Sequence, residues 1–233
     1  MKNLIILYFM VFMYACTSNH QDEVKPDAPI KPPAQDESEE IVKGKKLNLW
    51  ATMYYMKVVK PTSSGVPIRD MNDRVIGPTI SAQDWCLGAI EGTIMVDDTV
   101  YNYAGTKRPN QASCSHRPSS RVRWKVSPFK YGIGNRNNPL RPFKSIATDR
   151  SVIPSGSRLY IPAAVGVEYI FEGEKHVHNG IFYADDVGGA IKGNQIDVFI
   201  GAVDGGLSAA LEINPFEFIK SRSSATFEAY ILE

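Results

Sequence analysis

The sequence has few cysteines and almost no net charge. Its 233 residues include three cysteines, and 26 basic against 25 acidic residues leave a formal net charge of +1. No basic block with interleaved aromatic residues is present, which is the usual footprint of a nucleic-acid-binding surface. We therefore expect no nucleic acid partner.

Several common catalytic and cofactor motifs are also missing. The stretch GGAIKGN is not a phosphate loop, because its lysine precedes a glycine and no serine or threonine follows. GIGNRN lacks the third glycine of a dinucleotide fingerprint, and there is neither a His-Glu-x-x-His helix nor a nucleophile elbow. His176 and His178 could share a strand face, but nothing signals a third metal ligand. We expect no cofactor and no metal.

A long apolar run occurs at the N-terminus. It extends from Leu4 to Ala15, about a dozen residues, whereas a membrane-spanning helix needs about 20, so it is typical of a secretory signal. The segment FMYAC resembles a bacterial lipoprotein signal, in which the cysteine is lipidated and becomes the mature N-terminus, although Met13 stands where leucine is commonest. We predict a lipoprotein signal peptide at 1–15 and lipidation of Cys16. An ordinary cleavage site with an incidental cysteine is the alternative.

The following segment has little to bury. Residues 16–46 contain four prolines and a run of acidic residues, which predicts a disordered tether. Residues 47–233 are then one domain, held away from a membrane. Within it, Cys86 and Cys114 form either a disulfide, as an exported chain permits, or two buried free thiols.

Residues 47–233 read as many short strands separated by turns. A strand is expected at 47–59, a hairpin-like stretch at 65–81, and further strands or hairpins at 89–96, 99–105, 152–162, 167–188, 195–202 and 224–232, with a short helix at 208–213. No repeat period is apparent. This pattern predicts a mainly β fold with loop insertions, and favours a closed barrel over a sandwich or a doubly wound sheet.

The stretch DDVGGAIKGNQIDVF at 185–199 places carboxylates on both sides of a glycine-rich turn. Gly188 and Gly189 permit positive φ and close backbone approach. Asp197 lies between apolar neighbours on a predicted strand, so partial desolvation should raise its pKa. A carboxyl that keeps its proton near neutrality can act as a general acid. The alternative is a structural aspartate that caps turn amides.

Three segments resemble a known family. ADDVGGAIKGNQIDVFIG and SIATDRSVIPSGSRLYIP are similar to the signature of the 3D (three-aspartate) domain, which also occurs in the membrane-bound lytic transglycosylase A group, and ATMYY matches the family's opening. The resemblance implies a double-psi β-barrel and identifies the three aspartates as Asp149, Asp186 and Asp197. Asp197 corresponds to the catalytic acid and Asp186 to a neighbour that orients it.

The resemblance also implies an activity on bacterial cell-wall peptidoglycan. Asp197 would protonate the oxygen between N-acetylmuramic acid (MurNAc) and N-acetylglucosamine (GlcNAc), and its carboxylate would then take a proton from the muramic C6 hydroxyl, which closes a 1,6-anhydro ring. A non-catalytic glycan-binding barrel, or a hydrolase that uses Asp186 with Asp197, are the alternatives. Two departures from the family are the segment His178-Asn179-Gly180, where His-Asp-Gly is frequent, and the long polar stretch 105–122. The sequence also gives no signal for a separate second domain.

Further residues are expected to contact the glycan. The predicted substrate-binding residues are Thr52, Tyr54, Gly189 and Lys192, of which Lys192 could equally be a solvated turn lysine. The aromatic residues of 124–143 could line a groove or pack in the core: Trp124, Phe129, Tyr131 and Phe143. Together these features predict a monomer in the cell envelope, lipid-anchored at the outer membrane or periplasmic face, with peptidoglycan strands as its partner.

Overall fold

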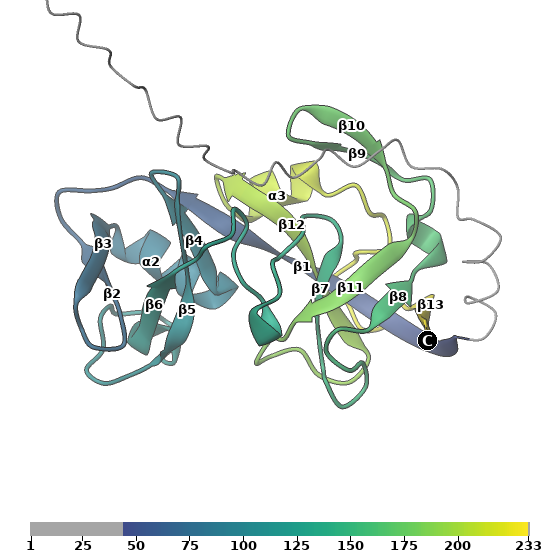
Figure 1. Ribbon diagram of the computed structural model, residues 1–233, viewed down its shortest axis with the longest axis horizontal. Helices are drawn as coiled ribbons and strands as arrows, with labels where there is room; N and C mark the ends of the chain where they lie inside the picture. Colours follow the sequence, from purple (N-terminus) through teal and green to yellow (C-terminus); the bar gives the residue numbers. More distant parts are fainter. Residues whose placement is uncertain (1–43, 233) are drawn as a thin grey trace, which may run out of the picture.

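The computed structural model describes residues 44–232 and consists mainly of β-strands arranged in two lobes (Figure 1). The predicted signal peptide, the lipidation of Cys16 and nearly all of the predicted tether lie outside the described residues. Strand β1 (Lys45–Val59) begins two residues before the expected start of the domain and runs through both lobes. None of the helices within 44–232 is long and apolar enough to cross a membrane.

The larger lobe, here called the ring lobe, is built on six strands that pair in a closed ring. Neighbours follow the order β12-β7-β11-β8-β13-β1, and an additional pairing of β1 with β12 closes the circle. The strands are β12 (Gln195–Asp204), β7 (Ser145–Thr148), β11 (Ile181–Asp186), β8 (Arg158–Tyr160), β13 (Phe227–Leu232) and β1. The predicted mainly β fold is therefore confirmed.

The core of the ring lobe explains why β12 is apolar at almost every position. This strand pairs with β1 on one side and β7 on the other, so Ile196, Val198 and Ile200 are fully enclosed. Phe182 of β11 and Phe216 pack on the same cluster. A hairpin, β9 (Glu168–Phe171) with β10 (Glu174–Val177), and the short helix α3 (Leu207–Ile213) complete the lobe, as the sequence predicts.

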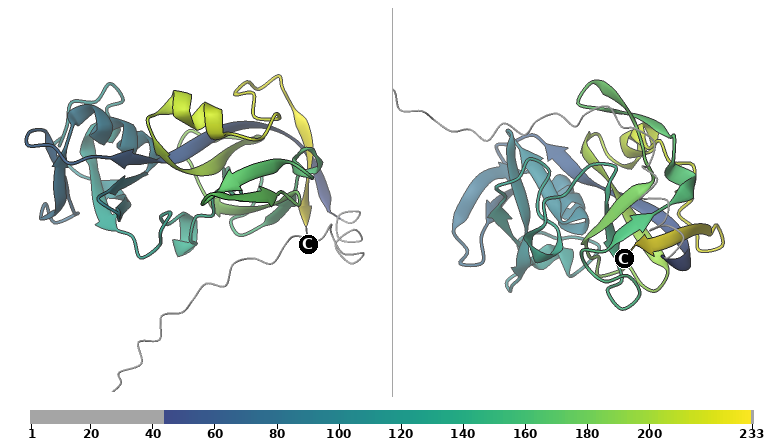
Figure 2. Two further views of the ribbon diagram at one scale, coloured as in Figure 1. Left: turned by 90° about the horizontal axis from the view of Figure 1, so that it is seen from above. Right: turned by 45° about the vertical axis from the view of Figure 1, so that its right-hand side comes forward.

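The smaller lobe, here called the insert lobe, comprises residues 60–127. It contains β2 (Val66–Arg69), β3 (Val75–Ile80), α2 (Ala82–Glu91), β4 (Thr93–Val96), β5 (Thr99–Thr106), the 3₁₀ turn η1 (Ser119–Arg121) and β6 (Val122–Val126). Its separate core centres on Trp85 and Trp124, whose rings meet edge to face at 6.0 Å. Figure 2 shows this lobe at one end of an elongated molecule, joined to the ring lobe through β1.

Helix α2 was not anticipated, and the strand predicted at 89–96 is wrong in its first half. Ser81 caps the helix by accepting a hydrogen bond from the Asp84 N–H at 3.0 Å, and it donates to the Asp84 carboxylate at 2.7 Å. Gly92 ends the helix in the left-handed conformation at φ 82°. The apolar residues after Ala89 therefore belong to two elements, and only Thr93–Val96 forms a strand.

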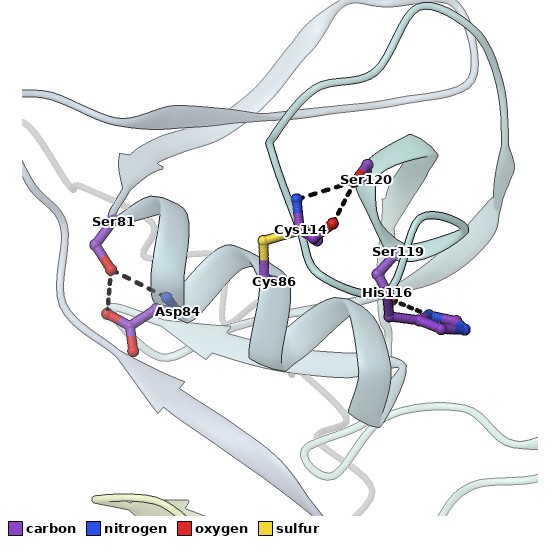
Figure 3. Close-up of a disulfide and its surroundings, with 7 residues drawn as sticks. All are labelled: Ser81, Asp84, Cys86, Cys114, His116, Ser119 and Ser120. Atoms are coloured by element: carbon purple, nitrogen blue, oxygen red, sulfur yellow. Dashed lines mark hydrogen bonds between the residues drawn. A yellow bond between two sulfur atoms is a disulfide. The ribbon is translucent and has the colours of Figure 1, made fainter.

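Cys86 and Cys114 form a disulfide, so the alternative of two free thiols is wrong. Their Cα atoms lie 5.5 Å apart, and the bridge joins the middle of α2 to the loop that precedes η1 (Figure 3). Ser120 supports the same loop through a hydrogen bond from the Cys114 N–H at 3.0 Å. The long polar stretch that departs from the family pattern is thereby fixed to a helix.

Candidate functional site

Two side chains of strand β1 donate hydrogen bonds to two carboxyl groups of the ring lobe. Thr52 faces Asp197 across the parallel β1–β12 pairing, and its hydroxyl donates to Asp197 Oδ1 at 2.6 Å. Two residues further along the same face, the Tyr54 hydroxyl donates to Asp186 Oδ2 at 3.0 Å. Gln195 donates from Nε2 to the Thr52 Oγ1 at 3.2 Å, which leaves the threonine proton directed at Asp197. The predicted positions Thr52 and Tyr54 thus contact the two predicted aspartates.

Asp186 lies at the end of β11 in a largely desolvated position. Burial raises its pKa to about 6, against the lowering effect of hydrogen bonds from the Val187 N–H, the Tyr54 hydroxyl and the Asn135 N–H. The neighbouring charge of Asp185 adds to the increase. This carboxyl therefore ionises close to neutrality rather than near pH 4.

Asp197 has the same character. Burial raises its pKa to about 6, the Thr52 hydrogen bond lowers it, and the charge of Asp186 raises it further. Two carboxyls that influence each other titrate as a pair, so one proton stays on the pair up to nearly neutral pH. The arrangement can supply a proton to a bound group and take one back, as general acid–base catalysis requires.

Asp149, the third signature aspartate, is in a different environment. It accepts hydrogen bonds from the Ser151 N–H and hydroxyl and from the Gly193 N–H at 2.9 Å, which lowers its pKa to about 2. A group with this pKa is ionised near neutrality and has no proton to give. Through these hydrogen bonds, Asp149 links the turn at Ser151 to the turn at Gly193, beside the carboxyl pair.

The glycine-rich turns differ in detail from expectation. Neither Gly188 nor Gly189 has positive φ, whereas Gly193 does, at φ 60°. A side chain at Gly188 would collide with Ile191, so this glycine serves close approach, while Gly189 borders open space. Lys192 is exposed beside Asp149, whose pKa it helps to lower.

Asp185 is a buried carboxylate that the sequence did not single out. Its side chain is almost fully enclosed, and it accepts from Arg141 Nη2 at 2.7 Å and from the Ser145 hydroxyl at 2.6 Å. Arg141 in turn stacks on the Tyr183 ring, 3.5 Å from its centroid. A buried charge with these partners is a structural support for Asp186. No sequence pattern connects positions so far apart in the chain.

Glu91 brings a further carboxyl from the insert lobe. As the last residue of α2, it accepts a hydrogen bond through Oε2 from the Tyr55 N–H at 3.1 Å, where the β1–β12 register shifts. Burial raises its pKa to about 7, the Tyr55 bond opposes this, and the charge of Asp197 adds to it. Sequence reasoning missed Glu91 because it assigned the residue to a strand.

The remaining predicted residues divide between core and surface. Trp124 and Phe143 are core residues, Tyr131 is half-buried and bonded to Glu172, and only Phe129 is exposed. His178 is also structural: its Nδ1 accepts from the Gly180 N–H, so its Nε2 donates to the Phe143 carbonyl. Within residues 44–232 no group of three potential ligand side chains is placed to hold a metal ion.

Comparisons with known proteins concern the family and the fold. Residues 144–209 match the family model of the 3D domain. No curated protein matches the chain.

Two solved structures share the fold. MltA from E. coli with bound chitohexaose has a TM-score of 0.54 at 19% identity, over 80% of this chain and 72% of the other. A membrane-bound lytic murein transglycosylase from Agrobacterium tumefaciens also has a TM-score of 0.54, at 12% identity, over 87% of this chain and 80% of the other. Residues 144–209 thus match the 3D domain, and the chain shares its fold with two proteins named lytic transglycosylases, in agreement with the resemblance seen in the sequence.

Proposed function

We propose that the protein is a peptidoglycan lytic transglycosylase that cleaves the MurNAc–GlcNAc bond and leaves a 1,6-anhydro-MurNAc end. The observation that carries the proposal is the carboxyl pair Asp197 and Asp186, held by Thr52 and Tyr54, with both pKa values raised to about 6. The 3D domain and the fold shared with proteins named lytic transglycosylases support the same reaction.

The reaction needs one group that gives a proton and then takes one. Protonated Asp197 donates to the glycosidic oxygen as the bond from the muramic C1 breaks. The resulting carboxylate removes the proton of the C6 hydroxyl, whose oxygen bonds to C1 and closes the ring, so Asp197 is protonated again. Asp186 raises the pKa of Asp197 and keeps it protonated at higher pH. General acid–base help of this kind contributes about 100- to 10,000-fold.

The proposal also includes the fold of the domain and its location in the cell. The six-strand ring is a double-psi β-barrel, and 47–233 is the unit that acts on the wall. A signal peptide at 1–15 directs export, and a lipid on Cys16 with the tether at 16–46 keeps the domain in the cell envelope as a monomer. Membrane fractionation of a Cys16→Ser variant tests the anchor: the variant should be released, and unchanged attachment would contradict it.

A second candidate is a cell-wall glycoside hydrolase. It is favoured by one observation, that Asp186 lies near Asp197 with a raised pKa and offers a second carboxyl. A module that only binds glycan is the third reading.

Digestion of purified sacculi separates the three. The full chain should release muropeptides that end in 1,6-anhydro-muramic acid, lighter by one water than hydrolytic products in mass spectrometry, and Asp197→Asn should release at least about 100-fold less. New reducing ends would indicate a hydrolase. Binding without any release, identical in Asp197→Asn, would leave the binding module.

A further inference from the structure

A second polar site lies beside the carboxyl pair. It is an open pocket of about 340 Å³ lined by Asn135, Arg136, Arg150, Pro154 and Ser155. Its lining comes from two separate segments, the turn η2 (Asn135–Asn137) and the turns that follow β7. The reaction proposed above uses none of these side chains.

The first segment is attached directly to the carboxyl pair. The Asn135 N–H donates to the Asp186 carboxylate, and Asn135 Nδ2 donates to the Ser155 hydroxyl at 2.6 Å across the pocket floor. Gly134 packs so closely on the backbone of Asp185 that a Cβ atom there would lie 2.4 Å from the Asp185 carbonyl oxygen. Gly134 and Asn135 therefore fix both one wall of the pocket and the position of Asp186.

The second segment is held by Asp149. Arg150 follows this residue directly, and the hydrogen bonds of Asp149 to Ser151 and to the Gly193 N–H fix the turn. The signature aspartates thus position not only the glycine turns but also the two arginines of the pocket, through Asp186 on one side and Asp149 on the other.

The backbone at Arg136 is held in an unfavourable conformation. Arg136 has φ 58° and Asn137 has φ 62°, both in the left-handed region. A non-glycine residue there costs about 1 kcal/mol or more. The surrounding bonds, such as the Gly134 N–H to the Asn138 carbonyl at 2.9 Å, maintain this turn. Its effect is to present the arginine at the rim of the pocket.

Neither guanidinium group of the pocket has a partner among the residues that the structure describes. Both arginines are exposed, and neither makes an ion pair or a side-chain hydrogen bond within residues 44–232. By contrast, three arginines elsewhere in residues 44–232 pair with aspartates: Arg74 with Asp70, Arg123 with Asp73 and Arg141 with Asp185. Two unpaired guanidinium groups on one pocket form a site for a planar anion, because each presents a fork of donors that matches a carboxylate.

We propose that this pocket binds a carboxylate of the peptide that branches from the muramic acid, so that the enzyme recognises peptide-bearing glycan. The inference rests on the proposed function, since it takes the glycan to lie at Asp186 and Asp197. The sugar chain itself is neutral once its lactyl acid is joined to peptide, so the acidic groups of the substrate are in that peptide. A guanidinium pair next to the cleavage site can bind a carboxylate of such a branch.

The test compares two forms of one substrate. Glycan strands prepared from sacculi are used either with their peptides or after an amidase has removed them. In the full chain, Arg136→Gln with Arg150→Gln should lower the ratio of kcat/KM on peptide-bearing over stripped strands by about tenfold, mainly through KM, given the usual strength of charge-assisted hydrogen bonds. The wild-type preference should also weaken as salt is raised.

The matched control replaces two exposed arginines elsewhere, Arg117→Gln with Arg222→Gln, and should keep the wild-type ratio. A ratio that is the same in wild type and in the pocket variant overturns the inference. If wild type releases product from neither substrate, the proposed function fails instead. Calorimetric titration then decides about the pocket by itself: a disaccharide-peptide should bind wild type more tightly than the pocket variant, and equal affinity overturns the inference.

Discussion

The two lobes differ in how they are held together and in what they carry. The ring lobe joins strands that are far apart in sequence, such as β1 with β12, and contains the carboxyl pair. The insert lobe is built from local pairings, β2 with β3, β4 with β5 and β5 with β6, around two tryptophans and the Cys86–Cys114 disulfide. Only the insert lobe is cross-linked within residues 44–232, while the ring lobe keeps raised-pKa groups that weaken it. The covalent cross-link and the proposed catalytic carboxyls thus lie in different lobes.

The largest expected effect concerns the chemistry of the ring lobe. Asp197→Asn preserves the hydrogen bond from Thr52 but cannot supply a proton, so release of muropeptides should fall by at least about 100-fold. Asp204→Asn, at the exposed end of the same strand, is the matched control and should keep full activity. An active Asp197→Asn variant would contradict the assignment of the chemistry to the ring lobe.

The same variant tests the cost of the site to folding. Because the folded state binds the Asp197 proton more tightly than the unfolded chain does, wild-type stability should fall as pH rises from about 4 to about 6. Asp197→Asn lacks this contribution, so its stability should decline less over that window. Denaturant unfolding at pH 4, 6 and 8 measures it, and parallel curves for the two proteins would contradict a raised pKa.

The next effect is on the insert lobe. Removal of the disulfide by Cys86→Ser with Cys114→Ser opens a loop of 28 residues, which should cost about 3 to 4 kcal/mol of unfolding free energy. Hydrogen exchange should rise in residues 60–127 first, because the ring lobe has its own core. Ser115→Ala in the same loop is the control. Equal loss of protection in both lobes would show that they unfold as one unit.

A smaller effect is expected from the partner carboxyl. Asp186→Asn removes the charge that raises the pKa of Asp197, so the alkaline limb of the pH–rate profile should move to lower pH. Each unit of this shift lowers activity above the pKa by about tenfold. Tyr54→Phe, which removes the hydrogen bond but keeps the charge, should not move the limb in that direction. An active variant with an unshifted profile would reduce Asp186 to a structural role.

The smallest effect links the lobes. Glu91→Gln keeps an acceptor for the Tyr55 N–H and removes a carboxyl whose pKa of about 7 lies above that of Asp197. Because Glu91 is mostly protonated where Asp197 ionises, the alkaline limb should move to lower pH only slightly, with less than a tenfold change in rate. The nearby charges, Lys57 and Asp84, pair with each other at 3.6 Å and stay in place. Glu212→Gln on α3 is the control. A profile identical to wild type would confine Glu91 to holding β1.

Much of the ring lobe could be predicted because its residues carry local patterns. The strands at 47–59, 195–202 and 224–232 show β-type composition between turn residues, and the spacing of the signature fixed Asp149, Asp186 and Asp197. The raised pKa of Asp197 followed from its apolar neighbours, but the lowered pKa of Asp149 was not predictable, because it depends on the Gly193 and Ser151 groups that the folded turns direct at its carboxylate.

The insert lobe was predicted less well. Helix α2 is short and its cap, Ser81 with Asp84, resembles an ordinary turn in the sequence. The supports of the site also depend on tertiary contacts: Asp185 meets Arg141 across 44 positions, and Glu91 meets Tyr55 across 36. A single sequence gives no signal for pairs of this kind, and the pairing of Cys86 with Cys114 was open for the same reason.

The course of β1 has a consequence for when the site can form. Thr52 and Asp197 are 145 positions apart. The first part of β1 pairs with β13, which is the last strand of the described chain. Contacts of such long sequence separation slow folding, because the entropy of closing a large loop is lost before the stabilising contacts form. During synthesis the chain would carry β1 exposed until nearly its whole length is available. The ring lobe therefore stays unfolded until β12 and β13 have been synthesised, and only then can Thr52, Tyr54 and their carboxyl partners come together.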